Sequence, residues 1–367
     1  MTPRLSSLVH LGGSVLRAHT TRLKWPLKIN LCLTYWCQYR CKTCNIWQRK
    51  PTDELTTDEL LRFVSKATAT SWLDVTGGEI FLRQDIGEIL LAIIRQWKRL
   101  AVLHFPTNGF LTDRIVSVTR QLAAERAVPV IVTVSLDGDE PLNDEIRGIK
   151  GGYRRQLDTF NALRRIAGVR AVFGVTLSRY NAGRLSRIFD ACREDSPGLS
   201  IEDFHVNLAQ TSSHYYGNDR GSGVRAALPD VRDDLRWYVD ARGRAKSPEA
   251  FVENRYLKLL DSFLATGVTP VPCHALRSSC FIDPWGTVFP CITFDHPIGR
   301  LRDADMDLSP IWTSAIAAET AGRIWKGQCP QCWTACEAYQ SILGNLLAPW
   351  RGAANRDVRP HEVEGTV

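Results

Sequence analysis

Residues 27–47, LKINLCLTYWCQYRCKTCNIW, decide the fold of this chain. An apolar, strand-like run ends directly in a loop that carries Cys37, Cys41 and Cys44 with the spacing C-x3-C-x2-C. Three thiolates in so short a loop can bind one face of a four-iron cluster and leave its fourth iron without a protein ligand. A zinc site closed by protein normally takes four ligands, often as two C-x2-C pairs. The spacing therefore favours an open iron–sulfur cluster, with a zinc knuckle or a coincidental cysteine cluster as the alternatives.

After Pro26 the sequence alternates between short apolar runs and amphipathic stretches, a pattern typical of parallel βαβ units. Six such strands predict an α/β fold, a partial (β/α)6 barrel of the TIM-like kind. Right-handed crossovers place the carboxyl ends of all strands at one end of the barrel, where parallel barrels collect ligands. We expect strands near 27–33, 72–76, 101–107, 130–136, 171–177 and 201–208, and helices near 54–69, 85–98, 112–126, 153–167 and 182–195.

Further motifs follow the predicted strands, namely Gly77-Gly78-Glu79, Thr107-Asn108-Gly109, and Ser135-Leu136-Asp137-Gly138 followed by residues 143–148. Together with the cysteine loop, they make most of the chain resemble the radical S-adenosylmethionine (radical SAM) enzymes. The resemblance implies a [4Fe-4S] cluster on the three loop cysteines, at which S-adenosylmethionine is reductively cleaved. The 5′-deoxyadenosyl radical so formed abstracts hydrogen from a substrate. It also implies an electron donor such as flavodoxin or ferredoxin, and it argues against zinc.

The resemblance further implies how S-adenosylmethionine is bound. Glu79 offers an acceptor to the methionine ammonium, and the two glycines before it allow close backbone approach. Arg147 suits the methionine carboxylate, unless it forms an ion pair with Asp144. Ser135 and Asp137 suit the ribose hydroxyls. One departure is the residue before the last loop cysteine, which is usually aromatic in the family. No catalytic residue is assigned, and the expected cofactor-binding residues are Thr43, Gly77, Gly78, Glu79, Asn108, Ser135, Asp137 and Arg147.

A second group of cysteines follows a predicted helix at 249–266. The segment 282–291 is typical of a β-hairpin, with Pro284 and Gly286 in the turn and Cys291 at its end. It is similar to the C-terminal SPASM or Twitch module of radical SAM enzymes, in which Gly-x4-Cys follows an earlier cysteine. The group consists of Cys273, Cys280, Cys291, Cys329, Cys332 and Cys336.

Six cysteines are too few for two auxiliary four-iron clusters with about four ligands each, so we expect one auxiliary [4Fe-4S] cluster. The shorter Twitch pattern selects Cys273, Cys291, Cys329 and Cys332 as its ligands. Cys280 and Cys336 remain as substitutes that the sequence does not rank. A structural zinc ion is the alternative, because four thiolates suit both metals. Cys192, alone on a predicted helix, is interpreted as an ordinary buried cysteine.

The charge of the chain is concentrated at its start. The net charge of the 367 residues is +7, yet residues 1–50 hold nine of the 46 Lys and Arg and no Asp or Glu. The remaining 37 basic residues face 39 acidic ones, a balance of −2, which argues against a nucleic-acid partner. The grouped cysteines favour the reducing cytoplasm over a secreted, disulfide-bonded fold. No apolar run is long enough for a membrane-spanning helix.

We expect four segments: a basic amphipathic leader at 1–26, the barrel at 27–266, the auxiliary module at 267–345 and a tail at 346–367. The leader places Leu5, Leu8, Val9, Val15, Leu16 and Leu23 on one helical stripe. One interpretation is a helix packed across the bottom of the barrel. The other adds weak contact of residues 1–25 with anionic membranes through an exposed basic edge, which would make the protein peripheral at the membrane. Alternatively, the cations offset the negative charge of cluster and cofactor.

The substrate is less well defined by the sequence. Residues 209–247 are expected to form a long connection, in which His214, Tyr215 and Tyr216 are candidate substrate contacts or loop-packing residues. Sulfatase-maturing relatives carry Asp where this chain has Ile292, which argues against that oxidation. Only 26 residues precede the first strand, too few for a winged-helix peptide-recognition domain. We therefore expect a small molecule, sugar or lipid-linked substrate. The alternatives are a ribosomal peptide or, from a different class, a non-catalytic iron–sulfur or zinc protein.

Overall fold

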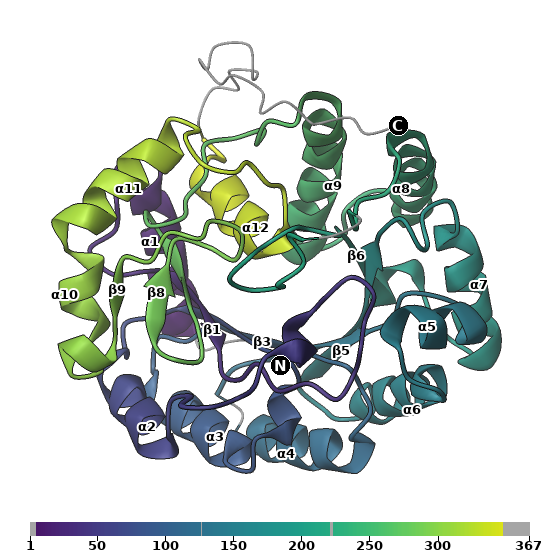
Figure 1. The fold of residues 1–367 in the computed structure, drawn as a ribbon, viewed down its shortest axis with the longest axis horizontal. Helices are drawn as coiled ribbons and strands as arrows, with labels where there is room; N and C mark the ends of the chain where they lie inside the picture. The colour runs from purple at the N-terminus through teal and green to yellow at the C-terminus, as the bar shows by residue number, and fades with distance from the viewer. Residues whose placement is uncertain (1–4, 126, 221–222, 348–367) are drawn as a thin grey trace.

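The computed structural model describes residues 5–125, 127–220 and 223–347, which form an open barrel of parallel strands wrapped by helices (Figure 1). Strands that follow one another in sequence pair in parallel, with the order β6-β5-β4-β3-β2-β1. The predicted α/β fold and its six strands are thereby confirmed. Their bounds are β1 (Lys28–Cys32), β2 (Trp72–Thr76), β3 (Val102–Thr107), β4 (Val130–Ser135), β5 (Val169–Leu177) and β6 (Phe204–Leu208).

The two faces of the strands differ in chemistry. Alternate residues are buried, as at Val130, Val132 and Val134 on β4, and belong to the core beneath the outer helices. The residues between them, such as Thr133 and Ser135, are half-buried and line the barrel interior. A strand with one apolar and one polar face holds a packed core outside and leaves a polar lumen inside. The outer helices are α2 (Thr57–Lys66), α3 (Ile86–Gln96), α4 (Thr112–Ala124), α5 (Glu140–Arg147), α6 (Gly152–Leu163) and α7 (Leu185–Asp195).

The C-terminal module continues the barrel sheet. Strand β7 (Ser279–Ile282) pairs in parallel with β1, and β8 (Thr287–Phe289) and β9 (Gly299–Arg300) follow in antiparallel order. The predicted hairpin turn is observed, with Gly286 at φ 81°. One nine-stranded sheet thus crosses the boundary expected near residue 267. Helices α10 (Leu308–Trp312), α11 (Ala315–Trp325) and α12 (Ala335–Gly344) complete the module.

The connection expected at 209–247 is wrong in its second half. Helix α8 (Leu228–Arg242) occupies that part, and the predicted last barrel helix follows as α9 (Pro248–Thr266). α8 buries Val231, Leu235 and Tyr238 at helical spacing. It escaped prediction because charged residues occupy many of its other positions and weaken the apolar pattern. Helix α5 was likewise not expected.

Helix α1 (Leu5–Ala18) packs across the amino-terminal end of the barrel, as one interpretation of the leader predicted. Ser7 Oγ donates to Lys98 O at 3.1 Å, next to the start of β3. The side that contacts the barrel, however, carries buried Ser7, Ser14 and Ala18, whereas most of the leucine-rich stripe faces outward. Small residues allow the helix to approach the barrel closely. In the ranges that the structure describes, no helix is long and apolar enough to cross a membrane.

Buried charges close the amino-terminal end of the lumen. The Lys28 ammonium lies 2.7 Å from Asp74 Oδ2 and donates to Cys336 O at 2.7 Å. On the other side, His104 Nδ1 lies 3.3 Å from Asp74 Oδ1. Burial opposes ionisation of Asp74, but Lys28 and His104 hold the pKa of its carboxyl below the ordinary value. This ion-pair layer joins β1, β2, β3 and α12.

Candidate active site at the carboxyl ends of the strands

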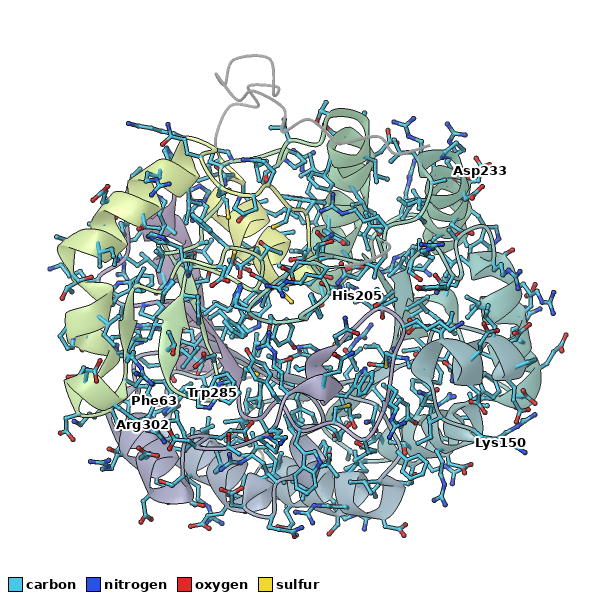
Figure 2. All side chains as sticks on the ribbon, viewed as in Figure 1. Phe63, Lys150, His205, Asp233, Trp285 and Arg302 are labelled. Carbon is cyan, nitrogen blue, oxygen red and sulfur yellow. The ribbon has the colours of Figure 1, made fainter. Side chains whose placement is uncertain are left out.

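The predicted motifs meet at one end of the barrel because each directly follows a strand. Cys37, Cys41 and Cys44 lie after β1, and the Gly77–Glu79 motif begins where β2 ends. Asn108 follows β3, and Asp137 follows β4. Figure 2 shows His205, the second residue of β6, near the middle of the barrel in this view. Parallel barrels build their sites on this rim.

The glycines of the β2 motif fit closely against the cysteine loop. Gly78 N donates to Thr34 O at 2.8 Å, and Glu79 N donates to Trp36 O at 2.7 Å. A Cβ atom on Gly77 would lie 2.5 Å from Thr34 O, and one on Gly78 would lie 2.2 Å from Trp36 O. The close backbone approach that these glycines permit is therefore to the loop that carries the cysteines.

Gly78→Ala is expected to displace the cysteine loop, because its Cβ would also lie 2.9 Å from Cys37 Cβ. Overpacking of this kind costs about 1–3 kcal/mol of unfolding free energy. We expect a lower melting temperature and less iron after reconstitution, measured by calorimetry and iron analysis. The control is Gly12→Ala on α1, where a Cβ meets nothing within 4 Å. Full iron loading of Gly78→Ala would contradict the role assigned to this contact.

The three loop thiols share one half-buried environment. Burial raises the pKa of Cys37 and of Cys44 to about 12, and each interacts electrostatically with Cys41. Burial also raises the pKa of Cys41, which the guanidinium of Arg147 counteracts. Within the described ranges, no three His, Cys, Asp or Glu side chains are close enough to hold a single metal ion. The cysteines of a four-iron cluster each bind a different iron. Three thiols beside a buried cation fit such an anionic cluster.

Glu79 ties the ends of β2 and β3 together. Its carboxylate is fully buried and accepts hydrogen bonds from Asn108 N at 2.7 Å, Thr107 Oγ1 at 3.0 Å and Phe81 N at 3.2 Å. Burial raises its pKa to about 7, despite these donors. An acid of this kind can exchange a proton near neutrality, and its charge is stabilised further by any cation that enters the site.

The raised pKa of Glu79 predicts a pH-dependent stability. The unfolded chain releases this proton near pH 4.5, whereas the folded chain retains it up to about pH 7. The contribution of Glu79 to the free energy of unfolding is therefore fully present below pH 4.5 and is lost as the pH rises through 7. Between pH 4.5 and pH 7, and without S-adenosylmethionine, the free energy of unfolding of wild type should fall by on the order of 3 kcal/mol relative to that of Glu79→Gln. Urea unfolding at a series of pH values measures this difference. Glu88→Gln, on the exposed side of α3, keeps Glu79, so its stability should follow that of wild type at every pH. Parallel curves for wild type and Glu79→Gln would refute the prediction.

Arg147 has a different partner from the one weighed in the sequence. Its Nε lies 2.8 Å from Asp137 Oδ2, and the side chains of Arg147 and Asp137 are only 11% and 2% exposed. The alternative of an ion pair with Asp144 is wrong, since Asp144 accepts from Gly151 N and Tyr153 N at the start of α6. Asp137 also accepts from Thr176 N at 2.8 Å. Its carboxylate is thus fixed between β5 and Arg147.

The other expected cofactor contacts lie around the same opening. Asn108 Nδ2 donates to Gln38 Oε1 at 3.1 Å and lies 4.0 Å from Cys37 Sγ. Ser135 ends β4 on the lumen face. Thr43 O accepts from Asn218 Nδ2 at 2.8 Å, which fixes the backbone before the last loop cysteine.

Residues 209–220 join the cysteine loop to the C-terminal module. His214 Nε2 lies 3.0 Å from Cys291 O, and its ring stacks on Phe289 with the centroids 4.5 Å apart. Tyr215 is buried, and its hydroxyl lies 2.6 Å from Thr76 Oγ1. Tyr216 O accepts from Asn45 N at 2.8 Å. The structure thus gives these candidate substrate contacts a packing role.

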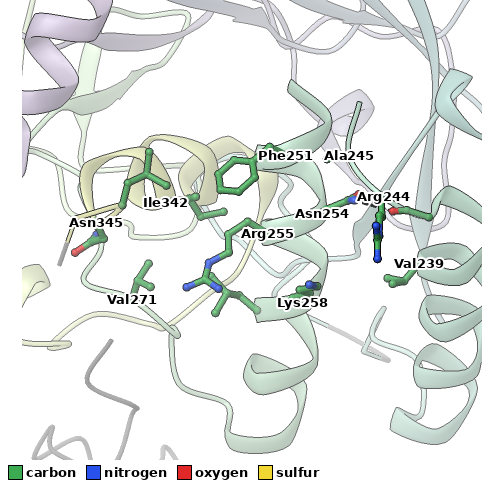
Figure 3. A pocket seen from close by; sticks show the side chains of 13 residues that line it. Val239, Arg244, Ala245, Phe251, Asn254, Arg255, Lys258, Val271, Ile342 and Asn345 are labelled. Carbon is green, nitrogen blue, oxygen red and sulfur yellow. Dashed lines mark hydrogen bonds between the residues drawn. The ribbon is translucent and has the colours of Figure 1, made fainter. Parts of the chain in front are cut away.

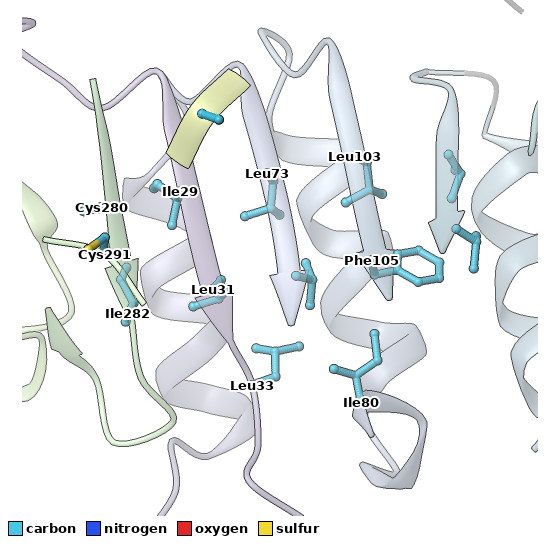
Figure 4. Packing of buried hydrophobic residues seen from close by; sticks show 14 of the residues in the cluster. Ile29, Leu31, Leu33, Leu73, Ile80, Leu103, Phe105, Cys280, Ile282 and Cys291 are labelled. Atoms are coloured by element: carbon cyan, nitrogen blue, oxygen red, sulfur yellow. The ribbon is translucent and has the colours of Figure 1, made fainter. Parts of the chain in front are cut away.

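The auxiliary cysteines separate into groups. Burial raises the pKa of Cys273 well above its ordinary value, and its electrostatic neighbours include Cys329, Cys332 and Cys291. Cys273 thus lies near the three other ligands expected from the sequence, and their role as ligands stays a prediction. Cys280 lies on β7 in the same apolar core cluster as Cys291 (Figure 4), but its charged neighbours are Glu337 and Arg22.

Two further residues lie beside this group, the substitute ligand Cys336 and Glu337, and the sequence analysis did not foresee a role for Glu337. Cys336 lies at the ion-pair layer, with Lys28 and Asp74 among its charged neighbours. Glu337 is buried, accepts from Asn30 Nδ2 at 3.2 Å and Ser279 Oγ at 3.0 Å, and interacts with Cys273. Burial raises its pKa to about 7. A glutamate on a helix carries no sequence signal of burial, so only the packing of α12 reveals it.

A cavity of about 570 Å³ lies away from this site, between α8, α9 and α12 (Figure 3). None of the predicted site residues lines it. Its walls combine apolar side chains such as Phe251 and Ile342 with cationic ones such as Arg244 and Lys258.

Two family models match the chain. The Radical SAM superfamily model covers residues 31–190, and the iron–sulfur cluster-binding SPASM domain covers residues 273–337. The chain belongs to the radical SAM superfamily and carries a SPASM-type module. Its cofactors at the family level are S-adenosylmethionine, an iron–sulfur cluster in the barrel and auxiliary iron–sulfur binding in the module.

Particular relatives are found in Bacillus subtilis (strain 168). The sporulation killing factor maturation protein SkfB is 26% identical over 171 residues, covering 46% of this chain and 40% of the relative. The antilisterial bacteriocin subtilosin biosynthesis protein AlbA is 24% identical over 318 residues, covering 83% of this chain and 63% of the relative. This chain thus spans less than two thirds of either relative.

Solved structures share the fold. Streptococcus suis SuiB bound to S-adenosylmethionine superposes with a TM-score of 0.57 at 18% identity, covering 82% of this chain and 68% of SuiB. Native anSMEcpe with bound AdoMet gives a TM-score of 0.60 at 13% identity, covering 88% and 97%. At these identities the likeness concerns the fold alone.

Proposed function

We propose that this protein is a radical SAM enzyme that modifies a peptide substrate. The observation that carries the proposal is the similarity, along 83% of the chain, to a protein of bacteriocin biosynthesis. A second relative is a maturation protein for a killing factor. These relatives favour the peptide alternative over the small molecule, sugar or lipid-linked substrate that was the first expectation.

In this proposal Cys37, Cys41 and Cys44 hold the S-adenosylmethionine-binding [4Fe-4S] cluster. When bound, cluster and cofactor supply the one-electron cleavage that generates a 5′-deoxyadenosyl radical. Arg147, buried beside Cys41, offsets negative charge, while Glu79 offers a carboxylate to the methionine ammonium. The remaining cofactor contacts are the loop backbone at Thr43, Gly77 and Gly78, and the side chains of Asn108, Ser135 and Asp137.

The 209–220 segment serves to exclude water from one side of the cysteine loop. Tyr215 is 7% exposed and packs with Tyr35 beside Cys37 and Cys44. On the other side Trp36 is 51% exposed. In this proposal the peptide enters from that side, toward the lumen face of β4 that carries Thr133 and Ser135.

Cys273, Cys291, Cys329 and Cys332 would hold one auxiliary [4Fe-4S] cluster. The burial of the Cys273, Cys291 and Cys332 thiols, and the electrostatic proximity of Cys329 to Cys273, support the assignment. A cluster there serves electron transfer or substrate ligation. The expected electron donor is flavodoxin or ferredoxin, and the grouping of the cysteines suits the reducing cytoplasm.

The test is anaerobic reconstitution with iron and sulfide, followed by dithionite, S-adenosylmethionine and synthetic peptides encoded by short reading frames beside the gene. The expected result is 5′-deoxyadenosine formed in step with a mass change in one peptide. Cofactor cleavage coupled only to a small molecule would refute the peptide substrate. No cleavage by a cluster-loaded sample would instead favour a non-catalytic iron–sulfur protein.

A further inference from the structure

Helix α1 is attached to the barrel through its small and polar residues. Ser7 and Ser14 are buried, and His10 Nδ1 lies 2.8 Å from Ser71 Oγ, just before β2. Leu11 and Val15 pack partly against the small cluster of Ala18, Leu23 and Leu27. The helix is therefore held in a defined orientation at the amino-terminal end of the barrel.

The opposite face of α1 is apolar and exposed. The exposed fractions are 77% for Leu5, 40% for Leu8, 66% for Val9 and 60% for Leu16. Positions 5, 8, 9, 12 and 16 repeat at helical spacing, and a Cβ on Gly12 would meet nothing within 4 Å. An amphipathic helix normally buries this stripe. No residue within the described ranges covers this one.

Exposed cations lie on the leader and beside the point where α1 is attached to the barrel. Arg17 and Lys24 are exposed on the leader, and Lys98 and Arg99 are exposed where the Ser7 hydrogen bond anchors α1. No Asp or Glu precedes Asp53 in the sequence. A second copy of the chain docking here through the same face would bring these cations together, whereas an anionic surface would neutralise them.

The same end of the barrel has further apolar and cationic groups. Leu346 and Leu347, which follow α12, are 44% and 73% exposed. α12 packs against both α1 and α9, and Leu346 lines the cavity of Figure 3. The exposed Arg244 and Lys258 belong to that cavity. Apolar side chains flanked by cations are typical of interfacial lipid binding.

We propose that this face, defined as Leu5, Leu8, Val9 and Leu16 of α1 with the flanking cations, docks on an anionic lipid membrane. The apolar side chains enter the interface while the cations contact the headgroups. This differs from the contact expected from the sequence, in which only a basic edge is exposed. The docking face lies at the end of the barrel opposite to the cysteine loop. The opening of the site at the carboxyl ends of the strands then points away from the membrane. Docking therefore anchors the enzyme and does not deliver a lipid substrate to the site.

The test is flotation of the reconstituted full chain with vesicles of phosphatidylglycerol and phosphatidylcholine, and with pure phosphatidylcholine. Wild type should bind the anionic vesicles, and raised salt should weaken binding. Val9→Glu/Leu16→Glu should lower the partition coefficient at least about tenfold, since two apolar side chains leave the interface. Val9→Gln/Leu16→Gln should lower it too, which separates lost apolar contact from added charge.

The matched control is Leu228→Glu/Ile316→Glu, which places the same charges on α8 and α11 at positions 46% and 43% exposed. It should bind like wild type, and S-adenosylmethionine cleavage should persist in all variants. The proposal is overturned if the control loses as much vesicle binding as Val9→Glu/Leu16→Glu. It is also overturned if wild type does not float with the anionic vesicles. A dimer in light scattering that Val9→Glu/Leu16→Glu dissociates would assign the face to a second copy. Binding that appears only after removal of residues 348–367 would assign it to that tail.

Discussion

Simultaneous replacement of Cys37, Cys41 and Cys44 by alanine is expected to remove about half of the iron, if each of two clusters holds four irons. Formation of 5′-deoxyadenosine should fall to the background level. The loop thiols share one environment after β1, whereas the C-terminal thiols form their own group. Iron and sulfide analysis, together with chromatography of the cofactor products, measures both effects.

Two single substitutions serve as controls for this experiment. Cys192→Ala removes a thiol buried on α7, next to Tyr153. Cys280→Ala removes one from the barrel core. Both should retain all the iron. Full iron in the triple variant would contradict the first cluster site, and loss in Cys280→Ala would show that the four-cysteine assignment is wrong. Zinc in the triple variant would replace the auxiliary cluster by a structural site.

Lys28→Met is expected to lower the free energy of unfolding by about 3–5 kcal/mol, because it leaves the carboxylate of Asp74 buried without its main counter-charge. The Lys28 side chain is 0% exposed, and that of Asp74 is 13% exposed. The ammonium also satisfies the carbonyl of Cys336, so β1, β2 and α12 should all loosen. Urea unfolding followed by circular dichroism measures the loss.

The matched control is Lys66→Met, which breaks a contact of 2.8 Å to Asp305 at the surface. Because that Asp305 side chain is 75% exposed, the loss should stay below about 1 kcal/mol. Lys28→Met/Asp74→Asn should recover part of the loss, since no buried charge is then left alone. Equal effects of Lys28→Met and Lys66→Met would mean that the buried pair does not stabilise the barrel.

The sequence by itself determined the elements and the cysteine groups. Apolar runs at period two and amphipathic stretches are local signals, so β1 to β6 were predicted to within a few residues. The turn at Gly286 is equally local, because a positive φ there favours glycine. Since each motif follows a strand, the crossover rule alone placed Cys37, Glu79 and Asp137 at one end.

Only the tertiary structure decided the partners of the buried charges and the direction of exposed faces. Lys28 meets the carbonyl of Cys336 across 308 positions of sequence, and His214 meets that of Cys291 across 77. The sequence spacing of such residues does not predict these contacts, because the contacts depend on how helices and loops pack on the sheet. For the same reason the periodicity of α1 revealed an apolar stripe but not its side. The stripe faces outward because Ser7, Ser14 and Ala18 are small enough for the helix to rest on the barrel.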